Sequence, residues 1–275
     1  MREFLRTQQH PDGGFKDRAG KSDLYYTVFG IDALTALQAE VSFGSMECYL
    51  EQFGNGPELD FVHLCCLARC WSALGPRGSS TGSGEIPYAK EILQRIEAFR
   101  TLDGGYHPNA GSEYGTAYGC FLALAAYHDL KADVPEPLRM VQCLKYLETT
   151  DGAWANERNI KVGSTNATAA ATTLLRHLHV PTNEIVSEWL LARCHPQGGF
   201  LAAPSAPLPD LLSTATALHA LAGLQVSFEP NKERCLDFID SLWTNEGGFH
   251  GHWSDDALDC EYTFYGLLAL GHLSL

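Results

Sequence analysis

Gln197-Gly198-Gly199-Phe200, a glycine pair followed by an aromatic residue, belongs to a series of similar sequences along the whole chain. The first glycine of each stands at position 13, 104, 152, 198 or 247, and Asn55-Gly56 lies near the middle of the long first interval. A period of this length is typical of one supersecondary unit stacked many times. We therefore expect six repeats, with further copies at Asp12-Gly13-Gly14-Phe15, Asp103-Gly104-Gly105-Tyr106, Glu246-Gly247-Gly248-Phe249 and the weaker Asp151-Gly152-Ala153-Trp154.

Each glycine sequence is followed by a short loop and then by an apolar run of helical length. The runs are apolar or small on nearly all sides, which is typical of buried helices. We expect them at Leu24 to Leu37, Leu59 to Leu74, Tyr114 to Tyr127, Thr168 to Leu178, Leu211 to Leu224 and Tyr262 to Leu270. The expected N-terminal caps are Ser22, Ser112, Ser164, Asp210 and Asp259.

Segments of a second kind separate the apolar runs. In these segments charged and apolar residues alternate at helical spacing, which indicates helices with one buried and one solvent-exposed face. They are Arg2 to Gln9, Ile86 to Arg100, Leu138 to Thr149, Glu184 to Cys194 and Lys232 to Trp243.

The alternation of the two kinds of helix predicts the fold. An open array of repeats needs polar end caps, whereas this chain begins on a half-exposed helix and finishes on the apolar segment Tyr262 to Leu275. Closure into a ring removes that need. We expect an all-α fold, an α/α toroid of twelve helices in two concentric layers, as one domain over residues 1–275. The glycine loops would surround the mouth of a central cavity, and no strand array is expected.

The composition of the chain narrows the classes of partner and the cellular location that we expect. The chain has 275 residues, 45% of them hydrophobic, and a formal net charge of -14. This charge argues against nucleic acids and anionic membrane surfaces as partners. No apolar run could span a membrane and no signal segment follows Met1, so we expect a cytoplasmic protein with its nine cysteines reduced. Pro76 to Gly84, rich in Gly and Ser, predicts a flexible surface loop.

The glycine loop before each buried helix resembles the repeats of protein prenyltransferase β subunits and of squalene and oxidosqualene cyclases, the terpenoid cyclase and prenyltransferase superfamily. The resemblance extends over all six repeats. It implies the α/α toroid, an isoprenoid as the bound molecule and, for the prenyltransferases, a helical-repeat α subunit as partner. It is specific for the fold and much less so for the activity.

The last repeat resembles these families most closely, at Asp259-Cys260-Glu261-Tyr262-Thr263. Prenyltransferases carry here an Asp-x-Cys pair of zinc ligands followed by Tyr, and the cyclases carry Asp-x-Asp-Asp-Thr, whose middle Asp protonates the substrate. Asp259 matches both patterns. Glu261 replaces the zinc-binding Cys or the protonating Asp, and Tyr262 keeps the prenyltransferase aromatic.

The zinc site and the diphosphate site implied by the prenyltransferase resemblance are both incomplete. Tyr26 stands where the third zinc ligand, a His, should be. Acidic residues or a histidine occupy the places of the basic cluster, namely His252, Asp255 or Asp256, and Asp210. A diphosphate would then need a bridging Mg²⁺. Metal binding, by Zn²⁺ or Mg²⁺, would fall to Asp259, Glu261 and His252.

Two interpretations of the paired carboxylates stay open. In the functional one Glu261 is a general acid, Asp259 its anionic partner and Tyr262 a third catalytic group, because neighbouring carboxylates and burial both raise a carboxyl pKa. In the structural one Asp259 and Glu261 only satisfy backbone donors and the helix dipole at a helix start.

Aromatic residues gather near the starts of the buried helices. They would line an apolar site and stabilise carbocations, although each alone is also explained by core packing. The substrate-binding residues that we expect are Tyr25, Tyr26, Phe29, Tyr114, Tyr118, His252, Trp253, Tyr265 and Asp210.

Three functions fit these observations. The first is an enzyme that binds a polyprenyl chain and starts carbocation chemistry with a proton. The second is a prenyltransferase β-like subunit with an altered metal site and an α-type helical-repeat partner. The third is a toroid that binds a lipid or a protein without catalysis. Because most of the zinc ligands and of the basic diphosphate-binding residues are replaced, the first function is favoured.

Overall fold

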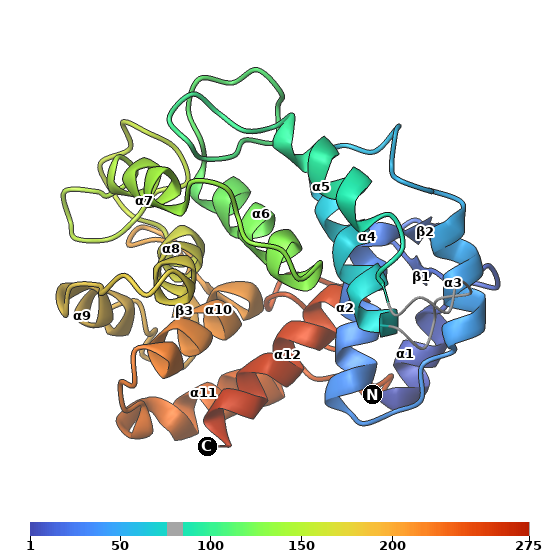
Figure 1. Cartoon of the computed structure of the whole chain (residues 1–275). Helices are drawn as coiled ribbons and strands as arrows, with labels where there is room; N and C mark the ends of the chain where they lie inside the picture. Colours follow the sequence, from blue (N-terminus) through green and yellow to red (C-terminus); the bar gives the residue numbers. More distant parts are fainter. Residues whose placement is uncertain (76–84, 275) are drawn as a thin grey trace.

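The computed structural model describes residues 1–75 and 85–274, so the loop expected at Pro76 to Gly84 lies outside the described residues. Within them the chain forms helices α1 to α12, which alternate between two layers (Figure 1). The inner layer consists of α2 (Leu24–Ala36), α4 (Phe61–Leu74), α6 (Ala117–Asp129), α8 (Thr165–His177), α10 (Leu211–Gly223) and α12 (Cys260–Leu273).

The inner helices close into a ring. Each packs against the next in the order α2, α4, α6, α8, α10, α12, and α12 packs against α2. Figure 1 shows the six around a common centre, with the blue and red ends of the chain side by side. The expected α/α toroid is therefore confirmed.

The outer layer covers the ring. It consists of α1 (Arg2–Gln8), α3 (Phe43–Glu51), α5 (Ala89–Glu97), α7 (Pro137–Lys145), α9 (Ile185–Leu191) and α11 (Lys232–Ser241). These helices are shorter than the inner ones and bury one face each, such as Cys235, Phe238 and Ile239 of α11. No helix among the described residues is both long enough and apolar enough to cross a membrane.

Some local predictions were wrong. The inner helices α2 and α6 are capped by Asp23 and Thr116 rather than by Ser22 and Ser112, because their loops extend further before the helix begins. Helix α3 lies in a segment where no half-exposed helix was recognised. Two small antiparallel ladders were also missed, β1 (Phe15–Lys16) with β2 (Ser22–Asp23) and β3 (Phe200–Leu201) with β4 (Pro209–Asp210).

The aromatic residue of each glycine loop ties the loop to its own inner helix. The backbone N–H of Phe200 donates to Thr214 Oγ1 at 2.9 Å, and Phe15 makes the same bond to Thr27. The Phe15 ring lies where a Cβ of Gly30, in the middle of α2, would stand. Each loop is thereby fixed against the helix that follows it.

The glycines themselves tie each loop to the next outer helix. Gly198 has φ +89°, and a Cβ there would overlap the Arg234 carbonyl oxygen of α11. The second glycine, Gly199, lies against the ring of Phe238. The last loop packs in the same way on the first outer helix, with Gly248 against Phe4. The repeated sequence thus encodes the contact between neighbouring units and also the contact that closes the ring.

Substitution of Gly198 tests this role. Gly198→Ala combines a left-handed backbone with a steric overlap, and we expect it to lower the free energy of unfolding by about 2–4 kcal/mol in urea denaturation. Gly44→Ala is the matched control, because nothing lies within 4 Å of its Cβ position and its φ is not positive. Equal stability of the two variants would show that the glycine loops do not hold the units together.

Candidate functional site

The ends of α2 and α12 meet at the side of the ring where the glycine loops lie. There the Tyr25 hydroxyl of α2 donates a hydrogen bond of 2.6 Å to Glu261 Oε1 of α12. The two residues are 236 positions apart in the sequence, so ring closure alone brings them together.

Aromatic rings surround this hydrogen bond. The ring of Phe29 lies 4.9 Å from Tyr25 and 5.5 Å from Tyr265, measured between centroids. Tyr26 and Phe264 extend the cluster at 5.6 and 5.7 Å from Tyr25 and Tyr265. We call these five rings, together with Glu261, the α2–α12 cluster.

The cluster faces the ring axis. Tyr25, Phe29, Glu261 and Tyr265 are half-buried, whereas their neighbours one position away toward the outer layer, such as Val28, are buried. Because the other faces of the inner helices are covered by adjacent helices, the remaining exposure is toward the axis.

Tyr118 approaches the cluster from the opposite side of the ring. It lies on α6 and keeps 41% of its surface exposed, and burial, with a further contribution from the charge of Glu261, raises the pKa of Tyr118. Burial, followed by the charges of Tyr265 and Glu261, raises the pKa of Tyr25 far above its ordinary value. The tyrosines are therefore neutral donors at any physiological pH.

Glu261 is held toward its protonated form. Burial is the largest influence and raises its pKa, and the nearby charge of Asp259 raises it further. The hydrogen bond from Tyr25 and the charge of Arg18 act in the opposite direction but do not cancel this rise. The surroundings of Glu261 therefore shift its protonation equilibrium to higher pH than that of an exposed glutamate.

Asp259 has a different role from Glu261. It is 1% exposed and caps α12 by accepting the Tyr262 N–H at 2.9 Å, as the structural interpretation expected. Its other oxygen accepts a 2.8 Å bond from Arg18 Nε. Arg18 also pairs with Asp255 at 3.1 Å and stands over the ring of Tyr262. Asp259 is thus a fixed anion, paired with a cation from the first repeat.

Arg18 is a site residue that was not predicted from the sequence. It lies between β1 and β2, in the turn that follows the first glycine loop. The expectation of a closed ring was sufficient to place this turn beside the last repeat, where an unpaired cation would meet the acidic residues.

The other predicted substrate-binding residues lie away from the cluster. Tyr114 is covered by the Arg158 guanidinium at 4.0 Å. Trp253 packs on Phe238 and donates to Ser241 Oγ of the outer helix α11. Tyr114 and Trp253 belong to loops of different units. A position near a helix start in the sequence does not show which of these loops meet in space.

Asp210 and His252 lie on the side of Tyr262. Asp210 caps α10 through Ser213, and burial raises its pKa despite the hydrogen bonds from Ser213. His252 Nδ1 accepts the Ser254 N–H at 3.1 Å. The charge of Asp210 contributes to the raised pKa of Tyr262, whose main cause is burial, and the role of Asp210 and His252 in binding stays a prediction.

No three His, Cys, Asp or Glu side chains gather as a potential metal site within residues 1–75 and 85–274. One oxygen of Asp259 is bound to Arg18 and the other to a backbone N–H. Binding of Zn²⁺ or Mg²⁺ by Asp259, Glu261 and His252 stays a prediction from the sequence.

A second charged group at the same side of the ring joins α2 to α4. His63 lies between two helix-capping carboxylates, with Nδ1 2.8 Å from Asp60 and Nε2 3.1 Å from Asp23. The hydrogen bond to Asp23 is the main reason why the pKa of His63 rises to about 9, with Asp60 contributing and burial opposing. His63 therefore links two helix starts through its two carboxylate partners.

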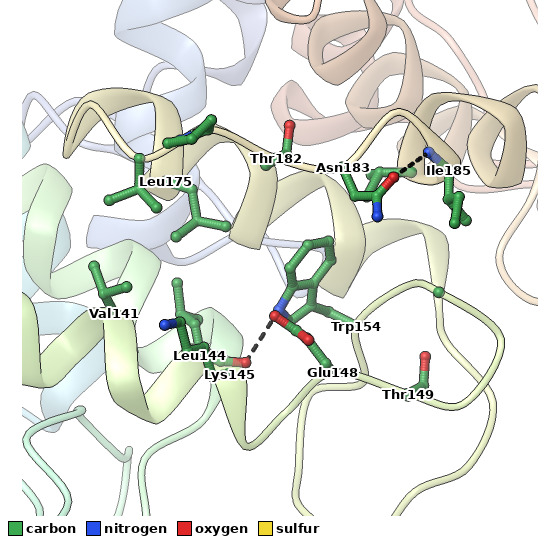
Figure 2. A pocket seen from close by; sticks show the side chains of 14 residues that line it. Val141, Leu144, Lys145, Glu148, Thr149, Trp154, Leu175, Thr182, Asn183 and Ile185 are labelled. Carbon is green, nitrogen blue, oxygen red and sulfur yellow. Dashed lines mark hydrogen bonds between the residues drawn. The ribbon is translucent and has the colours of Figure 1, made fainter.

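Two hollows lie outside the α2–α12 cluster. One, of about 320 Å³, is polar and is bordered by Tyr114, Glu113 and Arg158. The other, of about 180 Å³, lies between α7 and α9 and is drawn in Figure 2. The central cavity expected at the ring axis stays a prediction.

The family model of the prenyltransferase alpha-alpha toroid domain matches residues 1–63 and 167–274, and the chain belongs to this family. These residues include both halves of the α2–α12 cluster. No curated protein sequence matches the chain.

Solved structures share the fold at low sequence identity. Protein geranylgeranyltransferase-I of Candida albicans, complexed with GGPP, superposes with a TM-score of 0.70 at 14% identity, covering 98% of this chain and 89% of that one. A variant of the type II terpene cyclase MstE from Scytonema, in complex with geranylgeranyl dihydroxybenzoate, gives 0.65 at 14%, covering 98% and 93%.

The same fold also occurs in an enzyme with a sugar ligand. An inactive variant of α-1,6-mannanase from Salegentibacter sp., in complex with α-1,6-mannotriose, gives a TM-score of 0.63 at 12% identity, covering 99% of this chain and 97% of that one. Likeness at these identities shows the fold alone, so the function must be argued from the residues of the site.

Removal of Arg18 tests how much the Asp259 pair contributes to closure. Arg18→Gln leaves a buried carboxylate without its cation, and we expect a loss of about 1–3 kcal/mol in the free energy of unfolding. The control is Arg6→Gln, which breaks the exposed pair with Glu3 and should cost at most about 0.5 kcal/mol. If the two substitutions cost the same in urea denaturation, the Arg18 pair does not stabilise the ring.

His63 gives the protein a pH dependence on the alkaline side. Because its pKa is raised in the folded state, its contribution is fully present below the ordinary pKa of about 6.5 and is lost as pH rises toward about 9. Because His63 is partly exposed and solvent screens its charge, we expect the loss in the free energy of unfolding to be only roughly 1 kcal/mol. Thermal unfolding of the wild type and of His63→Gln should therefore converge with rising pH, and a constant difference would exclude this linkage.

Proposed function

We propose that the protein is an isoprenoid-binding enzyme in which Glu261 protonates a carbon–carbon double bond. The observation that carries the proposal is the position of Glu261, a carboxyl with a raised pKa that lies among aromatic rings and is joined to Tyr25. An acid in aromatic surroundings suits a substrate that is apolar and that becomes positively charged when it reacts.

The first step follows from this arrangement. The Glu261 O–H bond breaks as its proton forms a C–H bond with one alkene carbon, and the other carbon becomes a tertiary cation. The faces of Phe29 and Tyr265 can stabilise that cation by roughly 1–2 kcal/mol each where water is excluded. The carboxylate left behind keeps the hydrogen bond from Tyr25, which stabilises its new charge.

Asp259 and Arg18 act on the pKa of Glu261 in opposite directions, since the charge of Asp259 raises it and that of Arg18 lowers it. Asp259 accepts a hydrogen bond from Arg18, and the charge of Asp259 contributes to the raised pKa of Glu261. The internal attack of a second double bond on the cation would then form a ring, and loss of a proton to a base would end the reaction. The product would be an isomer of the substrate.

Known ligands of two similar structures support an isoprenoid. The protein geranylgeranyltransferase-I is complexed with GGPP and the MstE variant with geranylgeranyl dihydroxybenzoate. Arg18, the cation at the mouth, favours prenyl transfer as the second candidate, because it could accept part of a diphosphate charge. Transfer would in addition require the α-type partner that the family resemblance implies.

Substitution of Glu261 tests the acid. Purified protein is incubated with geranylgeraniol, GGPP or geranylgeranyl dihydroxybenzoate, and mass spectrometry with chromatography detects isomers of unchanged mass. We expect Glu261→Gln to lower the rate by about 10²–10⁴-fold while binding of the lipid and thermal stability stay unchanged. Equal rates would exclude Glu261 as the acid, and binding without any isomer or transfer product would favour a lipid-binding protein.

The pH profile gives an independent test. Since Glu261 must be protonated, the rate should fall as pH rises through its pKa. Tyr25→Phe removes a hydrogen bond that lowers this pKa, so the descending limb of the profile should move to higher pH. A limb that stays in place would mean that the titrating group is another residue.

A further inference from the structure

Two cysteines meet where the fifth glycine loop packs on α11. Cys194 lies just after α9 and pairs with Phe200 in an isolated β-bridge. The His195 N–H closes the turn between them by donating to the Gly199 carbonyl oxygen at 2.8 Å. Cys235 lies on the buried face of α11, and its Sγ accepts the Gly199 N–H at 3.4 Å. The Cys235 thiol also donates a hydrogen bond to the Cys194 sulfur, so the two sulfurs are neighbours across the contact between loop and helix.

The two thiols differ in access and in acidity. Cys194 is half-buried, whereas Cys235 is completely buried. The hydrogen bond from Cys235 is the main reason why the pKa of Cys194 is lowered, with burial opposing this and the Arg234 guanidinium adding to it. The hydrogen bond to Cys194, together with burial, raises the pKa of Cys235. Cys194 is therefore the nucleophile of the pair, because the thiolate rather than the thiol reacts.

The position of the cation follows from the packing of the loop. Arg234 Nη1 donates to the Pro196 carbonyl oxygen at 3.3 Å, so the guanidinium is held over the turn that begins at Cys194. A half-buried thiol beside a cation, with a second thiol in contact, is the arrangement of a cysteine that is oxidised first and then resolved by its neighbour.

A second pair of contacting thiols lies beside the third glycine loop and shows what access adds. Cys143 of α7 and Cys120 of α6 both lie against the position that a Cβ of Gly105 would take, and they share a hydrogen bond. Both are completely buried. Contact between the sulfurs is thus present in both pairs, whereas the pair at the fifth loop can also be reached by a dissolved reagent.

We propose that Cys194 and Cys235 form a reversible oxidation site, in which a hydroperoxide oxidises Cys194 and Cys235 then closes a disulfide. In the first step the Cys194 thiolate attacks the peroxide, an S–O bond forms, the O–O bond breaks, and the leaving hydroxide takes a proton and becomes water. In the second step the Cys235 sulfur attacks the Cys194 sulfur, an S–S bond forms and the S–O bond breaks. Hydroxide leaves with the Cys235 proton as a second water.

The two thiols together lose two electrons, which the peroxide gains, and a thiol reductant restores both. The disulfide joins the fifth glycine loop covalently to α11. The site is independent of the function proposed above, because the two share no residue.

The experiment treats the intact, reduced protein with hydrogen peroxide, blocks remaining thiols with N-ethylmaleimide and analyses a digest made without reductant by mass spectrometry. We expect a linked pair of peptides that contain Cys194 and Cys235, with a mass about 2 Da below the sum of the two reduced peptides. Cys120 and Cys143 should stay reduced, and dithiothreitol should remove the link. No link between Cys194 and Cys235, or an equal link between Cys120 and Cys143, would overturn the proposal.

Two substitutions of outer-helix thiols separate the steps. Cys235→Ser removes the resolving thiol, so the sulfenic acid of Cys194 should persist and be captured by dimedone, a reagent for sulfenic acids. Cys143→Ser makes the same change in the other pair and should leave the link intact. Equal capture by dimedone in the wild type and in Cys235→Ser, or loss of the link in folded Cys143→Ser, would contradict the proposed roles.

A variant at the half-buried position keeps the test available if Cys235→Ser fails to fold. In Cys194→Ser the buried Cys235 has lost its accessible partner, and we expect it to stay reduced under the same peroxide treatment. Oxidation of Cys235 in this variant would show that Cys194 is not the residue that the peroxide attacks first.

Discussion

The packing of α12 against α2 is the contact on which the rest of the structure depends. Without it the chain would be an open row of helical pairs, with apolar inner helices exposed at both ends. A glycine loop packed on an outer helix joins neighbouring units, and the same kind of contact supports closure, since Gly248 of the last loop lies against Phe4 of the first outer helix. The Arg18–Asp259 pair then fixes the loops on either side of the joint.

Closure also creates the candidate site. Tyr25 and Glu261 come from opposite ends of the chain, so the hydrogen bond between them exists only in the ring. Burial raises the pKa of Glu261, and aromatic rings surround its hydrogen bond with Tyr25. The structural joint and the proposed chemistry therefore use the same two helices, and both depend on closure of the ring.

Much of this fold could be predicted from the glycine period, because one loop type repeated along the chain implies one repeated helical unit. The loops differ in length before α2 and α6, and so the caps Asp23 and Thr116 were missed. Glu261 could be predicted as a candidate from its place in the last motif. Its bond to Tyr25, the Arg18 pair and the bridge made by His63 join distant parts of the sequence, so they required the three-dimensional ring.

A crystal structure of the protein with geranylgeraniol would test the central claim most directly. The account predicts that the isoprenoid chain lies along the ring axis against Phe29 and Tyr265, with a double bond within hydrogen-bonding reach of the Glu261 carboxyl. An isoprenoid bound elsewhere, or absent from protein saturated with it, would contradict the account and leave the α2–α12 cluster as a structural joint.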